Sequence, residues 1–386
     1  MAFNASAKLA IRVLYRKNGS KTHGFSTMVL NRRSSQSIVD DVHSVGMLSR
    51  NYSSASSSPE KADQMSRIKE LRELTSAPIK DVKSALVDCD WNIEAAQKEL
   101  RKRGVYLAAK KSSRTASEGL LALASDNNRT AVIELNCETD FVARNDIFQY
   151  VALSLAKLAL SEGPSQQVSE ALPLSPDYLE RLTLNLAHPK LSGEKSVQEA
   201  VIDLAAMMGE NVKLRRCFSM SKNSPGVIST YLHSSPQLGL GRIAGLLSLE
   251  VEDPNTDLTK LQSIGSEIAM HIVAEKPLFL TKELVSADTL ESEREILRSQ
   301  AEASGKPQMA IEKMVEGRLR KYYEDVVLME QKYVLNDTMK VATVLDNLSK
   351  EVGCPVKIGS FVRLEVGEGI ESAEANESET MEAQAV

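Results

Sequence analysis

The feature that most limits the fold of this chain is a pattern of two strands followed by a long helix, which occurs twice. The second copy starts about 110 residues after the first. The six segments, in chain order, are 118–123, 130–136, 146–160, 226–231, 242–251 and 258–275. The two copies share little identity, so pattern alone predicts an α+β core built from two related halves, 118–220 and 221–287.

Further helical patterns surround this core. A helix at 196–208 and a strand at 210–220 lie between the two copies, and a helix at 338–349 and a strand at 360–366 follow them. Two more helices at 288–303 and 308–323 flank Ser304-Gly305-Lys306-Pro307, which is typical of a helical hairpin. We expect this hairpin to protrude, with Leu290, Ile296 and Leu297 facing Ile311, Val315 and Leu319.

A three-helix module precedes the core, at 66–104. Apolar residues recur at helical spacing at 66–74, at 79–88 and from Ile93 onward, and Gly104 is expected to end the third helix. Asn92 is a candidate N-cap. The segment from Asp90 to Ala96 resembles the entry to the third helix of ubiquitin-associated domains, which implies a docking module rather than a catalytic one.

The first 58 residues are basic, rich in serine and poor in acidic residues. Eight of the 47 Lys and Arg but two of the 52 Asp and Glu lie in residues 1–52, so the remainder has a formal net charge of −11 rather than −5. The run at 8–17 can form a basic amphipathic helix, and the stretch from Leu48 to Ser54 resembles a mitochondrial processing site. We expect a mitochondrial transit peptide cleaved after Tyr52, with chloroplast import or an uncleaved basic tail as alternatives.

These patterns divide the chain into nine segments. They are a transit peptide (1–52), a linker (53–65), the docking module (66–104), a second linker (105–117), the two core halves (118–220 and 221–287), the helical hairpin (288–335), a C-terminal helix and strand (336–369) and an unstructured acidic tail (370–386).

Several kinds of chemistry lack their motifs. The four cysteines are scattered and make no CxxC pair, so neither a disulfide framework nor a zinc site is expected. No Gly-x-x-x-x-Gly-Lys-[Ser/Thr] and no Gly-x-Ser-x-Gly occurs, and the glycines at 239–245 run into a strand rather than a helix. No apolar run is long enough to span a bilayer. We therefore expect no cofactor, no metal and no enzyme activity.

The segment from Asn136 to Asp146 ends a strand and enters a helix. Asp140 and Phe141 lie at that tip, where side chains can project from a rigid edge. The simpler interpretation makes Asp140 a helix cap and Phe141 a core residue, and it stays open on these residues alone.

The chain here resembles a known family. Cys137-Glu138-Thr139-Asp140-Phe141-Val142-Ala143 is similar to the signature of elongation factor Ts, the guanine nucleotide exchange factor of elongation factor Tu. Five further matches occur in the same order and extend over about 66–369. They lie at 69–75, at 209–212 before Arg215-Arg216, at 269–272 before Lys276-Pro277, at 304–318 and at 361–369.

The resemblance implies that Asp140 and Phe141, flanked by Thr139 and Val142, enter elongation factor Tu near its nucleotide. The phenyl ring would act as a wedge that displaces the phosphate loop and the Mg²⁺. The expected partner is mitochondrial elongation factor Tu, GDP-bound or nucleotide-free. No nucleic acid or membrane is expected, and the stoichiometry is left open.

Weaker matches give six docking residues. Arg72, Ile79 and Lys83 match the family's N-terminal contact face, His233 a core histidine linked to the exchange surface, and Val334 and Leu335 an apolar pair of the C-terminal contact. Two departures weaken these matches. Thr75-Ser76-Ala77-Pro78 replaces a glycine-containing turn, and Lys332-Tyr333 stands where Pro-Phe is expected.

Two other functions remain as alternatives. One is a ubiquitin- or peptide-binding adaptor that uses the three-helix module, which would leave the whole core without a role. The other is an RNA-binding protein that uses the basic run at 101–111, against which the charge of −11 argues.

Overall fold

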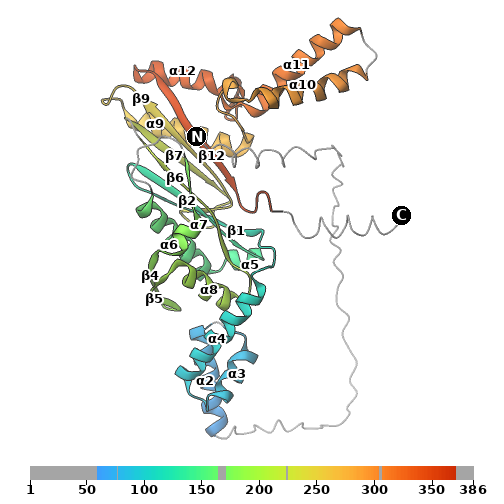
Figure 1. The fold of residues 1–386 in the computed structure, drawn as a ribbon. Coiled ribbons are helices and arrows are strands. Elements are labelled where there is room, and N and C mark those ends of the chain that lie inside the picture. Colours follow the sequence, from blue (N-terminus) through green and yellow to red (C-terminus); the bar gives the residue numbers. More distant parts are fainter. Residues whose placement is uncertain (1–58, 76, 164–170, 223–224, 304–306, 371–386) are drawn as a thin grey trace, which may run out of the picture. The chain divides into compact units, whose positions relative to one another are not determined.

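The computed structural model describes residues 59–75, 77–163, 171–222, 225–303 and 307–370 (Figure 1). The expected transit peptide with its cleavage after Tyr52 lies outside these residues, as does the acidic tail apart from Ile370. The chain divides into two units, Met1–Ser66 and Arg67–Val386, and the second holds all the described strands. Helices and antiparallel sheets make up this unit, which confirms the α+β class.

The two core halves repeat one arrangement of strands. In each half an antiparallel hairpin is followed by a long helix, and a second helix then leads to a third strand that pairs with the outer side of the hairpin's second strand. The first half uses β1 (Glu118–Ser125), β2 (Arg129–Cys137), α6 (Asp146–Glu162), α8 (Val197–Met208) and β6 (Lys213–Ser221). The second uses β7 (Gly226–His233), β9 (Ile243–Val251), α9 (Leu258–Glu275), α12 (Val341–Val352) and β12 (Val356–Glu365).

Short elements complete the two sheets. The first sheet has the order β3-β6-β2-β1-β8 and the second β12-β9-β7, and β4 and β5 form a separate hairpin. Their bounds, with those of α7, are Leu172–Leu174 for β3, Pro176–Glu180 for α7, Thr183–His188 for β4, Leu191–Ser196 for β5 and Leu240–Gly241 for β8. Because β8 pairs with β1, the loop that follows β7 carries the second half onto the first sheet.

The strand pattern explains how the halves pack. Successive side chains of a strand point to opposite faces, so a strand buried on both faces serves two cores. In β2, Ile133 packs under α6 and α8, whereas Val132 joins a second core formed with Leu246 of β9. A third core, around Leu249, lies between β9 and the helices α9 and α12. The two sheets therefore pack against each other, each with helices on its outer face.

A buried carboxylate joins the sheets where they meet. The fully buried Glu134 of β2 accepts hydrogen bonds from Arg215 and Arg216 of β6, at 3.0 Å for Arg215 Nη1 to Oε1, and from the N–H of Gly367 at 2.8 Å. Burial by itself raises the pKa of Glu134, but the Gly367 bond and the two arginine charges outweigh it and hold this pKa below its ordinary value. Glu368, two residues before the expected acidic tail, also pairs with Arg216.

The N-terminal module has the three expected helices with different ends. They are α2 (Pro59–Thr75), α3 (Ile79–Asp88) and α4 (Ile93–Lys111). Asn92 caps α4 by accepting the Ala95 N–H at 2.9 Å, as the sequence predicts. Two boundaries were wrong, because α2 begins seven residues before Ser66 and α4 does not end at Gly104.

Gly104 lies inside α4 because two helices meet there. A Cβ at this position would lie 2.8 Å from the Cβ of Ala206 in α8, so the glycine allows α4 to contact the core. Arg101 strengthens the same contact with a two-pronged ion pair to Asp203 of α8, at 2.8 and 2.9 Å. Much of the segment expected as a linker at 105–117 is therefore helical.

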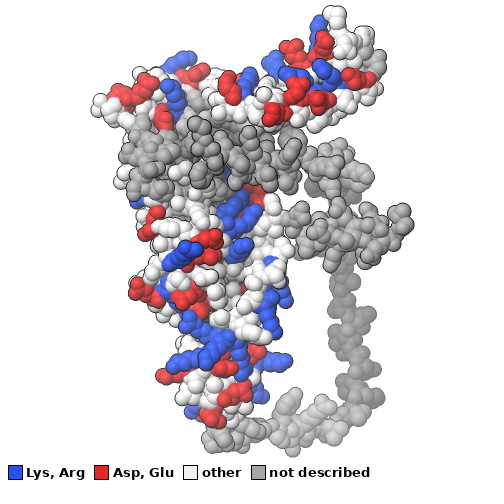
Figure 2. Space-filling view, in the orientation of Figure 1, with Lys and Arg blue, Asp and Glu red and all other residues white. Residues whose placement is uncertain are grey.

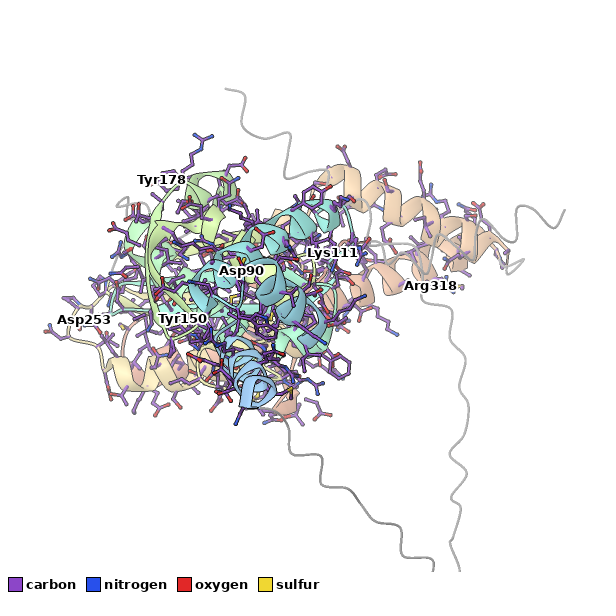
Figure 3. All side chains as sticks on the ribbon, turned by 90° about the horizontal axis from the view of Figure 1, so that it is seen from below. Asp90, Lys111, Tyr150, Tyr178, Asp253 and Arg318 are labelled. Atoms are coloured by element: carbon purple, nitrogen blue, oxygen red, sulfur yellow. The ribbon has the colours of Figure 1, made fainter. Side chains whose placement is uncertain are left out.

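The helical hairpin consists of α10 (Ala287–Glu302) and α11 (Gln308–Val326), and in Figure 1 it extends away from the sheets. Leu297, Ile311 and Val315 form its buried seam as expected, and Leu319 packs at the edge. The prediction for Ile296 was wrong. This residue is 51% exposed, because Leu297 and Ala301 occupy the side of α10 that faces α11. Arg318, labelled on this hairpin in Figure 3, donates a hydrogen bond to Gln300 across it at 3.1 Å.

The segment before α12 also differs from the expectation. Residues 338–340 were expected in a helix, but they belong to strand β11 (Asn336–Lys340), which pairs with β10 (Lys332–Tyr333). Asn336 favours the extended start because its side chain accepts the Thr338 N–H and hydroxyl. The remaining short elements are the 3₁₀ helices η2 (Lys282–Leu284) and η3 (Leu328–Glu330) and the single-turn helix α5 (Asp140–Ala143).

Candidate functional site

The tip that follows β2 is a single-turn helix, α5 (Asp140–Ala143), which carries one apolar side chain that points into solvent. Val142 and Ala143 are buried against the core, whereas the side chain of Phe141 lies in solvent with 78% of the residue exposed. The interpretation of Phe141 as a core residue is therefore wrong. The Asp140 carboxylate is not the helix cap either, since Thr139 holds that position and Asp140 pairs with Arg144 at 2.7 Å.

A carboxylate from the loop after α8 holds the base of this tip. Glu210 accepts the backbone N–H of Thr139 at 3.0 Å and its hydroxyl at 2.6 Å. The loop turns here because Gly209 ends α8 in the left-handed region, at φ 71°. The hydroxyl of Thr139 makes no bond to the first turn of α5, so its role is to bind Glu210.

A second, reciprocal set of bonds joins the same two loops. Glu138, next to Thr139, accepts the N–H of Asn211 at 2.6 Å. The side-chain amide of Asn211 in turn donates to the carbonyl oxygens of Ser112 and Arg114, at 3.2 and 2.7 Å. Arg114 closes the set with an ion pair to Glu138 at 3.3 Å. The Glu210-Asn211 dipeptide thus links the tip to the chain segment that leaves α4.

Lys111, the last residue of α4 and labelled in Figure 3, extends this network. Its ammonium group donates to the carbonyl oxygen of Gly209. Three segments far apart in the sequence therefore meet under Phe141, which makes the position of the ring a property of the fold rather than of a flexible loop.

Cys137 lies directly beneath the tip and is fully buried. Its thiol donates to the carbonyl oxygen of Thr139 at 3.1 Å. Burial, with the negative charges of Glu210 and Glu118, raises the pKa of this thiol to about 12. Cys137 therefore stays a protonated packing residue and is no nucleophile.

Sequence analysis missed two residues beside the tip, Gln149 and Leu238. The amide of Gln149 on α6 donates to the carbonyl oxygen of Ala143 at 3.3 Å and accepts from the amide of Gln237 at 3.0 Å. Next to Gln237, Leu238 is 97% exposed on the loop between β7 and β8. Neither residue belongs to a periodic pattern, and the proline and glycine around Leu238 show a turn without showing what it faces.

His233 lies on the same side of the fold as this loop, at the end of β7. It is exposed, and its Nδ1 lies 3.3 Å from the hydroxyl of Tyr231. The backbone reverses at Ser234, with φ 53°, and returns through β8 to the first sheet. The structure thus connects His233 through one loop to Gln149 and the tip.

The other expected docking residues lie elsewhere. Three of them lie on the N-terminal module and are exposed. They are Arg72 on α2 and Ile79 and Lys83 on one face of α3, outside the small core of this module. Val334 and Leu335 form the exposed turn between β10 and β11. No described contact joins either group to the tip, so the structure presents three separate surfaces.

Among the described residues, no group of three His, Cys, Asp or Glu side chains is placed to hold a metal ion. Among the helices that the structure describes, none has the length and apolar character needed to cross a membrane.

Two arginines of the basic run at 101–111 are paired with acidic side chains. Figure 2 shows Lys and Arg side chains where Figure 1 draws α4, with acidic side chains among them. Arg103 pairs with Asp88 at 2.8 Å and with Glu99 at 2.9 Å, and Arg101 pairs with Asp203. These pairs reduce the charge available to a polyanion.

Comparisons with known proteins agree on one family. A family model described as Elongation factor TS matches residues 138–368. A protein of Ricinus communis named "Elongation factor Ts, mitochondrial" is 68% identical over 88% of this chain and 89% of its own length. One of the same name from Arabidopsis thaliana is 63% identical over 87% of this chain and 85% of its own. An "Elongation factor Ts" of Paramagnetospirillum magneticum is 42% identical over 83% of this chain and 96% of its own.

Proposed function

Since this chain belongs to the elongation factor Ts family, we propose that it binds elongation factor Tu in its GDP form and promotes release of the nucleotide. The family makes the protein a translation elongation factor, and its similarity to the mitochondrial members places it in mitochondria. The proposal therefore concerns the partner, the mechanism and the residues that carry them out.

The exposed ring of Phe141 is the observation that carries the proposal. Leaving an aromatic side chain in water forgoes roughly 1.5–3 kcal/mol of burial free energy. The fold nevertheless holds this ring outward on a helix that Glu210, Glu138 and Cys137 fix from below. Such an arrangement suits a side chain that is buried in a partner rather than in its own core.

The mechanism requires no bond to be made or broken. A GTPase holds GDP through the amides of its phosphate loop and through Mg²⁺. Phe141 inserts beside that site as a rigid wedge, and Asp140 enters with it, so that the phosphate loop and the metal cannot keep their places. Binding of the factor and binding of GDP then weaken each other reciprocally, by a coupling of about 3 kcal/mol or more for an efficient factor.

The remaining surfaces provide affinity. Arg72, Ile79 and Lys83 dock the N-terminal module on the GTPase, and His233 extends the contact beside the tip. Val334 and Leu335 form a separate apolar contact at the other end of the core. All six side chains are exposed, which such a role needs.

The protein acts in this proposal as an exchange factor and not as an enzyme. The ubiquitin-binding alternative is less favoured because α4 continues past the module and packs on α8 through Gly104. The RNA-binding alternative is less favoured because Arg101 and Arg103 are already paired with carboxylates.

The test is release of labelled GDP from purified mitochondrial elongation factor Tu. Phe141→Ala should slow the stimulated release about tenfold or more, equal to about 1.4 kcal/mol of barrier. Leu284→Ala is the matched control, because Leu284 is also an exposed apolar side chain, at 60%, but lies in η2 outside the three surfaces. Wild-type release by the Phe141 variant would refute the wedge.

A pull-down tests the partner independently of the rate. The chain without residues 1–52 should retain elongation factor Tu, and excess GDP should dissociate the pair because the two ligands weaken each other. A complex that excess GDP leaves intact would contradict an exchange mechanism.

A further inference from the structure

The apolar turn between β10 and β11 does not have the sequence that such a turn prefers. Tyr333 pairs with Asn336, which leaves Val334 and Leu335 as the two residues of the turn. Two-residue hairpin turns favour Gly, Asn or Asp, because their twist needs positive φ angles. Neither Val334 nor Leu335 is among the described residues with positive φ. The turn is therefore not one of the types that match the twist of a two-residue hairpin, so a contact from outside can help to fix its conformation.

A buried histidine of α9 makes the contact that reaches the turn. The backbone N–H of Val334 donates to Nδ1 of His271 at 3.2 Å. The ring of His271 is fully buried and lies 6.0 Å from the ring of Tyr333, centroid to centroid. Tyr333 is itself fixed by a 2.6 Å hydrogen bond from its hydroxyl to Glu267.

The other side of the ring is fixed by Gln331, whose orientation leaves no choice of tautomer. The side-chain amide nitrogen of Gln331 donates to the carbonyl oxygens of Glu275 and Asp325, at 3.1 and 2.8 Å. Its amide oxygen therefore faces Nε2 of His271, at 3.0 Å, and can only accept. Nε2 must carry the proton, and Nδ1 is left bare to accept from Val334.

Burial supports the neutral form of this ring. It lowers the pKa of His271 below the ordinary value, and the Gln331 bond and the charge of Glu275 oppose this without reversing it. A ring protonated on both nitrogens would lose its only acceptor and with it the bond to Val334.

We propose that His271 is a positioning residue for the Val334-Leu335 contact: the neutral Nε2–H tautomer, set by Gln331, fixes the backbone of the turn so that both apolar side chains meet the partner GTPase. The proposal rests on the proposed function, since it needs that partner. His271 touches neither nucleotide nor tip and acts only through the turn.

Two neutral substitutions separate this role from a general contribution to packing. The amide of asparagine reaches the position of Nδ1, and the amide of glutamine reaches that of Nε2. His271→Asn can keep an acceptor for Val334 N–H and loses the bond to Gln331. His271→Gln keeps the bond to Gln331 and loses the acceptor. Both remove the ring, so their general effects on packing are similar.

The assay is GDP release at increasing concentrations of mitochondrial elongation factor Tu–GDP. His271→Gln should raise KM about fivefold, the effect of one net hydrogen bond, and change kcat much less, because the tip is untouched. His271→Asn should recover most of that affinity, and Leu335→Ala should raise KM as well. Equal KM values for the two His271 variants, or a loss confined to kcat, would overturn the proposal.

The tautomer can be measured without any variant of His271. In the full chain with ¹⁵N-labelled histidine, two-bond ¹H–¹⁵N spectra at neutral pH should show one ring protonated at Nε2 alone. His23→Gln, His43→Gln, His188→Gln and His233→Gln each remove one signal, which identifies the other four histidines and leaves that of His271. A His271 ring protonated at Nδ1 would overturn the proposal even if neither variant of His271 folds.

The two proposals fail in distinguishable ways. If the wild-type chain does not accelerate GDP release, the proposed function is refuted. If the wild-type chain does so and the two His271 variants have the same KM, only the role of His271 is refuted.

Discussion

The contact between Glu210 and Thr139 offers the sharpest test of how the tip is held. Glu210→Ala removes both hydrogen bonds to Thr139, whereas Thr139→Val removes only the 2.6 Å bond from the hydroxyl and keeps the shape of the side chain. A hydrogen bond to a charged group contributes about 1.5–3 kcal/mol. Because both residues are partly solvated, the lower end applies. We expect losses in the free energy of unfolding of about 3 kcal/mol for Glu210→Ala and about 1.5 kcal/mol for Thr139→Val.

The double variant decides whether these losses share one interaction. Thr139→Val in the Glu210→Ala background should cost almost nothing further, so the cycle should give an interaction energy of about 1.5 kcal/mol in urea unfolding. Glu312→Ala on the exposed face of α11 is the control and should change stability little. In the GDP-release assay Glu210→Ala should also slow release, although Phe141 is intact. Two results would refute the claim that the contact between Glu210 and Thr139 positions the ring of Phe141. One is that the two losses in stability are additive, and the other is that the Glu210→Ala variant releases GDP at the normal rate.

Two further predictions concern the framework that carries the site. Gly104→Ala should destabilise the fold by about 1 kcal/mol, because the added Cβ meets Ala206 at 2.8 Å; Gly317→Ala in the open middle of α11 should instead stabilise it by about 1 kcal/mol through helix propensity. Thermal unfolding checks both, and equal shifts would contradict the close contact of α4 with α8. Glu134→Gln should cost about 3 kcal/mol in urea unfolding at neutral pH, because two arginines lose their buried partner. Because the pKa of Glu134 is lowered by folding, the stability that its carboxylate contributes is present above the unfolded-state pKa near 4.5 and is lost as the pH falls through the folded-state pKa. The stabilities of wild type and variant should therefore converge in acid. A difference that stays constant with pH would argue against this ion network.

Local signals predicted most of the elements. The strand and helix patterns of both halves, the N-cap at Asn92 and most of the seam of the helical hairpin depend on neighbouring residues, and the structure contains them. One error, at Gly104, came where a distant contact outweighs local preference. Gly104 is a helix terminator by local rules, but the approach of Ala206 makes a glycine necessary inside the helix.

The candidate site shows the same division. The signature from Cys137 to Ala143 and the match at 209–212 could be found separately in the sequence, yet nothing in either showed that Glu210 binds Thr139 or that Asn211 binds the end of α4. The exposure of Leu238 and the bridging role of Gln149 had no signal at all. The bonds of Glu210 and Asn211 join positions 71 to 99 residues apart, and the bond between Gln237 and Gln149 joins positions 88 apart, so no local pattern could predict them.

The sequence by itself determined the class of the protein: a repeated α+β core, a small helical module and the family with its Asp140-Phe141 signature. Those conclusions need only periodicity, turn chemistry and motifs, which are local. The tertiary structure decided whether Phe141 lies in the core or in solvent, because burial depends on what the rest of the chain brings to that place. It also decided the protonated nitrogen of His271, since Gln331 and Val334 reach the ring only when β10 packs beside α9.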